Sequence, residues 1–261
     1  MLTDLSGARA LITGSTTGIG FSIAEQMLAT GAQVIINGRS SERLDAALER
    51  LNSRGQVSGI VADAGTAEGC AAIAEAAPHV DILINNVGIF APRPVFEIPD
   101  EEWERFFAVN VMSGVRLTRS YMPGMIERGW GRVIFISSES AVQVPSEMVH
   151  YGMTKLAQLA VARGFAEAGA ETGVTVNSVL PGPTSSEGVQ HFVRELVEHR
   201  DRPGDEVGRE FMRQFRPTSL IGRLASTEEV ANAVVFLASR QASAITGTAL
   251  RVDGGLIRHV I

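Results

Sequence analysis

The chain has 261 residues, of which 45% are hydrophobic and 20% charged, a composition that supports a packed core and excludes extensive disorder. Its net charge of −6 argues against a nucleic-acid-binding protein, because such proteins usually present a basic face. No apolar run approaches the roughly 18 residues of a membrane span, and no secretory signal is visible, so we expect a cytoplasmic protein without a membrane partner. The lone Cys70 allows no internal disulfide, and the five histidines show no metal-ligand spacing.

Short runs rich in Val, Ile and Leu alternate with helical patterns along the chain. The predicted strands are Arg9–Thr13, Gln33–Asn37, Val57–Val61, Val80–Ile84, Arg132–Ile136, Val174–Leu180 and Thr248–Val252. The predicted helices are Gly18–Ala29, Ser41–Ser53, Thr66–Ala76, Asp100–Arg128, Tyr151–Thr172 and Thr227–Ala238. We expect Pro123 to kink or break the fourth of these helices. The alternation predicts one α/β domain over residues 1–261, doubly wound around a mostly seven-stranded parallel sheet.

One segment, at about 183–222, departs from this alternation because it contains no strand pattern. Val189, Phe192, Val193, Leu196 and Val197 share one face of a predicted helix, and Val207, Phe211 and Phe215 indicate a second short helix. An insertion of this length beside the carboxyl edge of a sheet is often a lid or substrate loop. The alternative is a helical pair that packs for stability or assembly.

A glycine-rich turn joins the first predicted strand to the first helix. Gly14, Gly18 and Gly20 follow a G-x-x-x-G-x-G spacing rather than G-x-G-x-x-G. Glycine lets backbone turn with positive φ or approach a ligand closely, and a helix N-terminus offers free N–H groups to a pyrophosphate. The turn is therefore predicted to bind a dinucleotide.

The residues at the end of the second predicted strand indicate which dinucleotide binds. An acidic residue there usually holds the ribose 2′-hydroxyl of NAD, whereas a nearby arginine accommodates a 2′-phosphate. This chain has Arg39 and Ser40 and no carboxylate at that place. We infer a preference for NADP(H), with NAD(H) as the alternative.

The basic residues comprise 22 arginines and a single lysine, Lys155, which lies four residues after Tyr151. Residues i and i+4 share a face of a helix, so the phenol and the ammonium can point into one cleft. A fixed ammonium stabilises a phenolate and lowers its pKa, which makes a tyrosine usable as an acid or base.

These features together resemble the short-chain dehydrogenase/reductase family, including members such as 3-oxoacyl-carrier-protein reductase. The resemblance extends from Leu5 to Gly255. The motifs that carry it are Thr13-Gly14-x-x-x-Gly18-x-Gly20, Asn85-Asn86-Val87-Gly88, Asn110, Ser138, Tyr151-x-x-x-Lys155, Asn177 and Pro181-Gly182. It implies a Rossmann-type domain, an NAD(P) cofactor and a homotetramer (or homodimer).

The resemblance also implies roles for four residues. Tyr151 would protonate the carbonyl oxygen in reduction or act as base in the reverse direction. Lys155 would hold the nicotinamide ribose and lower the pKa of Tyr151. Ser138 would hydrogen-bond the substrate oxygen, and Asn110 would anchor a water relay to Lys155.

Cofactor contacts are expected across the carboxyl edge of the sheet. The residues are Gly14, Ser15, Thr17, Gly18, Ile19, Gly20, Arg39, Ser40, Asp63, Ala64, Asn86, Gly88, Tyr151, Lys155, Pro181, Gly182, Thr184 and Ser186. Val87 stands where the family usually has alanine, and we expect local repacking there. His150 should not share the face of Tyr151, so we expect it in the substrate pocket or at a helix cap.

The leading hypothesis is an NADP(H)-dependent oxidoreductase for a carbonyl or secondary-alcohol substrate. A 3-oxoacyl-carrier reductase and a dehydrogenase for small alcohols, sugars or ketones both remain open, including an NAD-dependent one. A non-catalytic NAD(P)-binding regulator on the same fold would not need all four catalytic residues. A methyltransferase would have no use for the Tyr–Lys pair.

Overall fold

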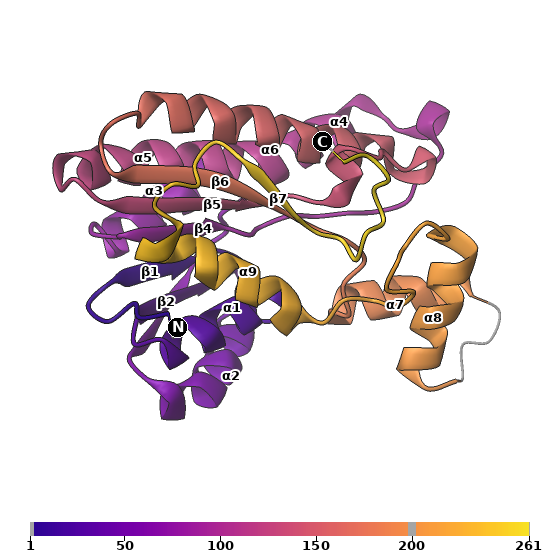
Figure 1. The fold of residues 1–261 in the computed structure, drawn as a ribbon, viewed down its shortest axis with the longest axis horizontal. Helices are drawn as coiled ribbons and strands as arrows, with labels where there is room; N and C mark the ends of the chain where they lie inside the picture. Colours follow the sequence, from indigo (N-terminus) through magenta and orange to yellow (C-terminus); the bar gives the residue numbers. More distant parts are fainter. Residues whose placement is uncertain (1–2, 198–201, 261) are drawn as a thin grey trace.

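In the computed structural model, which describes residues 3–197 and 202–260, seven parallel strands form one sheet in the order β3-β2-β1-β4-β5-β6-β7 (Figure 1). The strands are β1 (Arg9–Ile12), β2 (Gln33–Gly38), β3 (Val57–Val61), β4 (Ile82–Asn85), β5 (Gly131–Ile136), β6 (Val174–Pro181) and β7 (Ala249–Val252). The order reverses beside β1, which places a crevice at the carboxyl ends of β1 and β4. The predicted Rossmann-type parallel sheet is confirmed.

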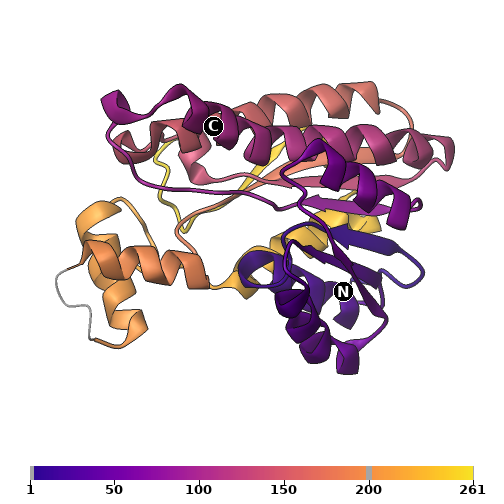
Figure 2. The same cartoon turned by 180° about the vertical axis from the view of Figure 1, so that it is seen from behind.

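Helices cover both faces of this sheet (Figures 1 and 2). One face carries α1 (Gly18–Ala29), α2 (Ser41–Leu51) and α9 (Thr227–Ala238). The opposite face carries α3 (Ala67–Ala76), α5 (Ser113–Glu127) and α6 (Val149–Ala168), with α4 (Asp100–Phe107) ahead of α5. Along β1, Ala10 and Ile12 pack toward the first layer and Leu11 toward the second, which explains the unbroken apolar run in the sequence.

The predicted helix over Asp100–Arg128 is interrupted, but at a different place from the one expected. A π-helical turn at Ala108–Met112 separates α4 from α5, whereas α5 continues through Pro123 to Glu127. Of the two outcomes expected at Pro123, a kink or a break, the break does not occur. Proline costs the helix one backbone hydrogen bond, but Met122 and Met125 beside it are buried against the sheet, and this packing keeps the helix in place.

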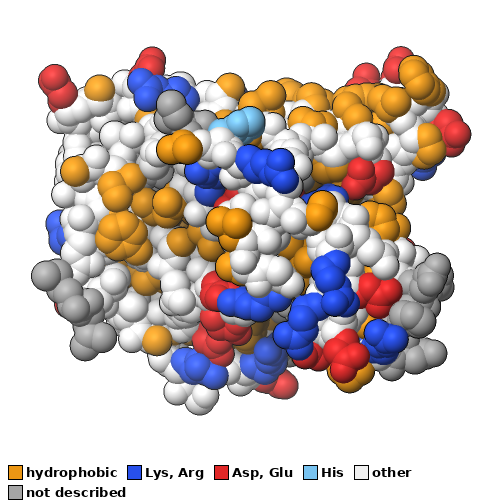
Figure 3. Space-filling model, turned by 45° about the vertical axis from the view of Figure 1, so that its right-hand side comes forward, with side chains coloured by type: hydrophobic (Ala, Val, Ile, Leu, Met, Phe, Trp, Pro, Cys, Tyr) orange, Lys and Arg blue, Asp and Glu red, His pale blue; other side chains and the backbone are white. Residues whose placement is uncertain are grey.

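The insertion contains two helices, as predicted: α7 (Glu187–Leu196) and α8 (Gly204–Phe215). They form their own small apolar cluster, in which Val193, Phe211 and Met212 are buried. Residues 198–201 lie outside the described part of the chain. Figure 1 shows the pair at one end of the sheet, and Figure 3 brings this end forward, where Lys or Arg and Asp or Glu side chains lie interspersed.

Residues 3–197 and 202–260 contain neither a helix that could span a membrane nor a cluster of metal ligands. No described helix is both long and apolar enough to cross a membrane. The same residues contain no group of three His, Cys, Asp or Glu side chains that could hold a metal ion, and His199 lies outside them.

A capping box at the start of α9 allows a test of the fold. The Ser226 hydroxyl accepts from the Glu229 N–H at 3.2 Å, and a Glu229 carboxylate oxygen accepts from the Ser226 N–H at 2.8 Å. Ser226→Ala should lower the free energy of unfolding by about 1 kcal/mol, because an N–H at the helix start loses its partner. Urea denaturation measures this loss, and Ser53→Ala, an exposed hydroxyl away from the cap, should stay close to the unchanged chain.

Candidate active site

The glycine-rich turn leads from β1 into the N-terminus of α1 and is shaped for close approach. Gly14 and Gly18 have φ values of +59° and +60°. A Cβ on Gly20 would lie 2.6 Å from Asn86 Nδ2 and 2.7 Å from the Gly14 oxygen, so no side chain fits there. Thr17 is the N-cap of α1 and makes no side-chain capping bond, and the first turn holds no acidic residue. These features fit a pyrophosphate at the helix N-terminus.

Three polar side chains hold the turn in this shape. Asn86 donates from Nδ2 to the oxygens of Thr13 and Gly14, both at 2.9 Å. The hydroxyl of Ser15 is buried and donates to the Ile12 oxygen at 2.7 Å, so Ser15 links the turn to the end of β1. Asn37 donates to Ile60 and Ala62 at 3.0 and 3.1 Å, which ties the turn's neighbour β2 to β3.

The residues expected near the adenosine follow β2 and β3. Arg39 is exposed and has no hydrogen bond or ion pair with the described residues. Ser40 caps α2 by accepting from the Arg43 N–H at 3.3 Å. Asp63 is exposed and accepts from the Gly65 N–H at 2.9 Å, with Ala64 buried behind it. The Arg39 guanidinium is thus available to an anion at the edge of the turn.

Tyr151 and Lys155 lie in the first turns of α6 and face one pocket. Lys155 is buried, its Nζ lies 5.6 Å from the centre of the Tyr151 ring, and it donates to the Ile136 oxygen at 2.9 Å. The Ser137 hydroxyl donates to the Lys155 oxygen at 2.8 Å, which ties α6 to the end of β5. Ser138, next in the chain, lines the same pocket. The three residues are therefore brought together as predicted.

The pKa values in this cluster differ from expectation. Burial raises the pKa of Tyr151, the nearby Glu139 charge raises it further, and a hydrogen bond with Ser138 acts in the opposite direction. Burial also lowers the pKa of Lys155 to about 8. The expected lowering of the Tyr151 pKa is thus wrong for the protein alone: the Lys155 ammonium is bonded to the Ile136 carbonyl, and the cost of a buried phenolate dominates.

Asn110 lies in the π-helical turn, and its side chain reaches the segment after β4. Its Oδ1 accepts from the Ile89 N–H at 2.8 Å, and its Nδ2 donates to the Ile89 oxygen and the Thr154 hydroxyl at 3.0 and 2.9 Å. Its main-chain oxygen accepts from Gln158 Nε2. Asn110 therefore positions the chain at Gly88, beside Lys155, and the water relay stays a prediction.

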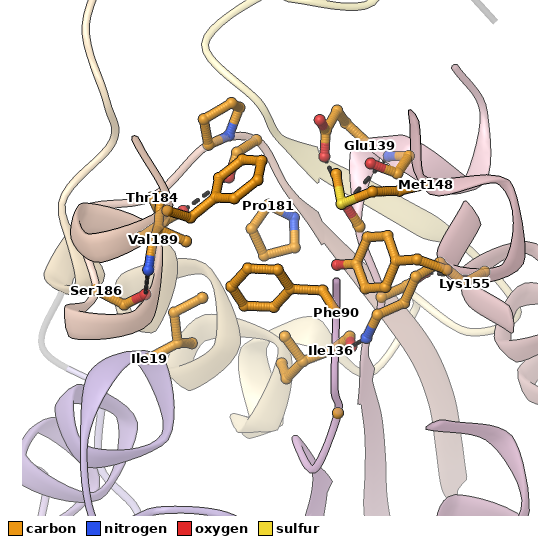
Figure 4. Close-up of a pocket in the computed structure, with 18 of the residues that line it drawn as sticks. Ile19, Phe90, Ile136, Glu139, Met148, Lys155, Pro181, Thr184, Ser186 and Val189 are labelled. Carbon is orange, nitrogen blue, oxygen red and sulfur yellow. Dashed lines mark hydrogen bonds between the residues drawn. The ribbon is translucent and has the colours of Figure 1, made fainter. Parts of the chain in front are cut away.

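A cavity of about 210 Å³ joins this cluster to the glycine turn (Figure 4). Besides Tyr151 and Lys155, its lining includes seven of the expected cofactor contacts, namely Ile19, Asn86, Gly88, Pro181, Gly182, Thr184 and Ser186. Thr184 donates to the Gly182 oxygen at 2.8 Å, and Ser186 caps α7. The insertion contributes Val189, Phe192 and Phe211 to the wall opposite Tyr151, with Phe90 beside them. This placement agrees with a substrate loop, and that role stays a prediction.

Two charged pocket residues were not identified from the sequence. Glu139 is buried, and its Oε2 accepts from the Ser138 hydroxyl at 2.5 Å. Arg216 follows α8, and its Nε lies 4.0 Å from Glu139 Oε1. Glu139 directly follows Ser138, and this adjacency was the one available signal; nothing in the sequence placed Arg216 beside it.

His150 lies elsewhere than expected. It is fully buried between α6 and α4, with its ring 4.1 Å from that of Phe106 and its Nε2 3.3 Å from Glu102 Oε1. It neither lines the pocket nor caps α6, so both expected roles are wrong. The helical rotation that separates it from Tyr151 turns it into the apolar contact with α4.

Comparison with known proteins agrees with this site. A family model described as enoyl-(acyl carrier protein) reductase matches residues 14–257. An uncharacterized oxidoreductase, YvaG of Bacillus subtilis (strain 168), is 49% identical over the full length of both chains. The chain belongs to the short-chain dehydrogenase/reductase family. It is accordingly an oxidoreductase of the NAD(P)-dependent type.

Two further members of the family give a broader comparison. Gluconate 5-dehydrogenase of Gluconobacter oxydans (strain 621H) is 32% identical, covering 98% of this chain and 96% of the relative. The crystal structure of L-sorbose reductase from Gluconobacter frateurii, complexed with NADPH and L-sorbose, superposes with a TM-score of 0.92 at 33% identity over all of both chains.

The crowding at Gly20 can be tested directly. Gly20→Ala should weaken NADPH binding and destabilise the fold by roughly 1–3 kcal/mol, because the new methyl group must displace Asn86 or the Gly14 backbone. Cofactor fluorescence titration and thermal unfolding measure the two effects. Gly164→Ala, where a Cβ in helix α6 meets nothing within 4 Å, should leave NADPH binding intact and stabilise the helix by up to about 1 kcal/mol.

Proposed function

We propose that this short-chain dehydrogenase/reductase transfers a hydride between NADP(H) and a carbonyl or secondary-alcohol substrate, with Tyr151 as the general acid or base. The observation that carries the proposal is the pocket shared by Tyr151, Lys155, Ser138 and the end of the glycine turn. When bound, the nicotinamide supplies or accepts the hydride.

The side chains of the pocket divide the remaining work. In the direction of reduction, the Tyr151 hydroxyl donates its proton to the substrate oxygen, and its raised pKa keeps that proton in place until then. Ser138 offers a second hydrogen bond to the same oxygen. The Lys155 ammonium is fixed by the Ile136 carbonyl and points along the pocket floor, where it can hold ribose hydroxyls. The apolar wall from α7 and α8 limits the access of water.

The preference for NADP(H) rests on Arg39. The guanidinium is exposed beside the glycine turn, and Gly38 before it packs against Thr16 of that turn. No carboxylate occupies the Asn37–Ser40 segment to hold a ribose 2′-hydroxyl. The L-sorbose reductase that resembles this chain was solved with NADPH.

The substrate belongs to the broad class of ketones and secondary alcohols. The names of the similar proteins suggest L-sorbose and 5-ketogluconate as the first ketones to test. Oxidation of NADPH or NADH in the presence of each ketone separates an enzyme from a regulator that only binds the cofactor. A homotetramer (or homodimer) and a cytoplasmic location stay predictions.

Removing the hydroxyl group of Tyr151 tests its role as the general acid. Tyr151→Phe should lower turnover on the order of 10²–10⁴-fold while NADPH binding persists, because the ring still fills the pocket and only the proton donor is lost. Steady-state NADPH oxidation and fluorescence titration measure the two properties. A variant that reduces every accepted ketone at the original rate would refute the assignment of Tyr151.

The phosphate contact is tested at Arg39. Arg39→Ala should weaken NADPH binding roughly 10- to 100-fold, the usual loss of hydrogen bonds between charged groups, and leave NADH binding nearly unchanged. Isothermal titration with both cofactors measures the difference. Arg119→Ala, an exposed arginine on the opposite side of the sheet, serves as the matched control. Equal weakening toward both cofactors would remove Arg39 from the 2′-phosphate site.

A further inference from the structure

Ser138 has a buried carboxyl group, Glu139, as a hydrogen-bond partner inside the pocket. The Ser138 hydroxyl donates to Glu139 Oε2 at 2.5 Å, and the same oxygen of Ser138 accepts from the Ser140 N–H at 3.1 Å. A hydroxyl has one hydrogen and room for two acceptor contacts. With the hydrogen given to Glu139 and one acceptor position given to Ser140, a single acceptor position remains, and it is the one open to Tyr151, which hydrogen-bonds Ser138, or to a substrate.

The state of Glu139 therefore decides what Ser138 offers to a substrate. When Glu139 is ionised, it takes the Ser138 hydrogen, and Ser138 can only accept, which suits an alcohol O–H. When Glu139 is protonated, it donates to the Ser138 oxygen and fills the last acceptor position. The Ser138 hydrogen is then free to point at a carbonyl oxygen.

We propose that Glu139 is a positioning residue that sets the direction of the Ser138 hydrogen bond, so that protonated Glu139 favours ketone reduction and ionised Glu139 favours alcohol oxidation. This inference rests on the proposed function, because it needs Ser138 to contact the substrate oxygen. No proton leaves Ser138 or Glu139 during the reaction: the substrate oxygen exchanges its proton with Tyr151 in either direction.

The charged and titratable groups around Glu139 come from three other parts of the chain. Arg216, after α8, lies 4.0 Å away with its side chain 13% exposed, and it also contacts Glu147 at 3.4 Å. Tyr151 and Lys155 approach from α6 and line the same pocket. Burial raises the pKa of Glu139, whereas the Arg216 charge and the hydrogen bonds from Ser138 and Ser140 lower it. Arg216 thus gives the insertion electrostatic influence over the catalytic serine.

The test is the pH dependence of kcat/KM for the ketone that supports NADPH oxidation. In the unchanged enzyme, kcat/KM for reduction should fall about tenfold per pH unit above the Glu139 pKa, as one ionisation requires. Glu139→Gln should abolish this decrease of kcat/KM with pH. In the variant, the amide oxygen of Gln faces Arg216, which leaves the amide N–H to donate to Ser138 at every pH. Glu147→Gln is the matched control and should keep the decrease.

A second variant removes the positive charge that faces Glu139. Arg216→Met should move the midpoint of that decrease upward by roughly one pH unit or more, because the opposite charge that favours ionised Glu139 is gone. Arg213→Met, which removes an exposed arginine of the preceding helix α8, should leave the midpoint in place. A midpoint that is unaffected by both Glu139→Gln and Arg216→Met overturns the inference, even if Tyr151→Phe has already established the proposed function.

A measurement without substrate keeps the inference testable if no ketone is turned over or the Gln variant fails to fold. Difference infrared spectroscopy across a pH titration detects the C=O band of a protonated carboxyl group. A band that is absent from Glu139→Gln, or shifted in midpoint by Arg216→Met, supports the inference. A Glu139 that titrates like an exposed carboxyl group overturns it.

Discussion

Two hydrogen bonds between α6 and the end of β5 fix the positions of Tyr151, Lys155 and Ser138 relative to one another. Lys155 Nζ donates to the Ile136 oxygen, and the Ser137 hydroxyl donates back to the Lys155 oxygen. The helix can satisfy both only with Tyr151, one turn earlier, facing the same cavity. Ser138 follows Ser137 directly and is brought in by the same contact. The geometry of the active site thus depends on how one helix is docked on one strand end.

The sequence allowed much of this site to be predicted because its determinants are local. The strand–turn–helix context of the glycines and the four-residue spacing of Tyr151 and Lys155 fix short-range geometry, and all of these residues lie where the motifs place them. Strand and helix types were also predictable, because inner strands such as β1 and β4 are buried on both faces and appear in the sequence as apolar runs. The break at Ala108–Met112 was not, since a π-helical turn has no composition signal and its residue Asn110 makes a long-range contact with Ile89.

Electrostatic interactions between residues far apart in the chain could not be predicted from the sequence. Glu139 and Arg216 are far apart in the sequence, and only the folded insertion brings them within 4.0 Å. The pKa of Tyr151 was mispredicted for a related reason: the spacing to Lys155 gives the sign of one interaction, whereas burial and Glu139 act on the same phenol through the tertiary structure. His150 likewise was assigned by its neighbour in sequence, and its true surroundings are the aromatic side chains of α4.

Because the chain contains a single lysine, the ammonium group of Lys155 can serve as an experimental probe. Lys155 is the sole lysine, and it lines the cavity that it shares with Tyr151 and the end of the glycine turn. Any reagent that modifies side-chain amines therefore has one side-chain target in this molecule, and that target lies in the proposed nucleotide site. Protection from such a reagent would report occupancy of this proposed site without mutagenesis, isotopic labelling or knowledge of the substrate.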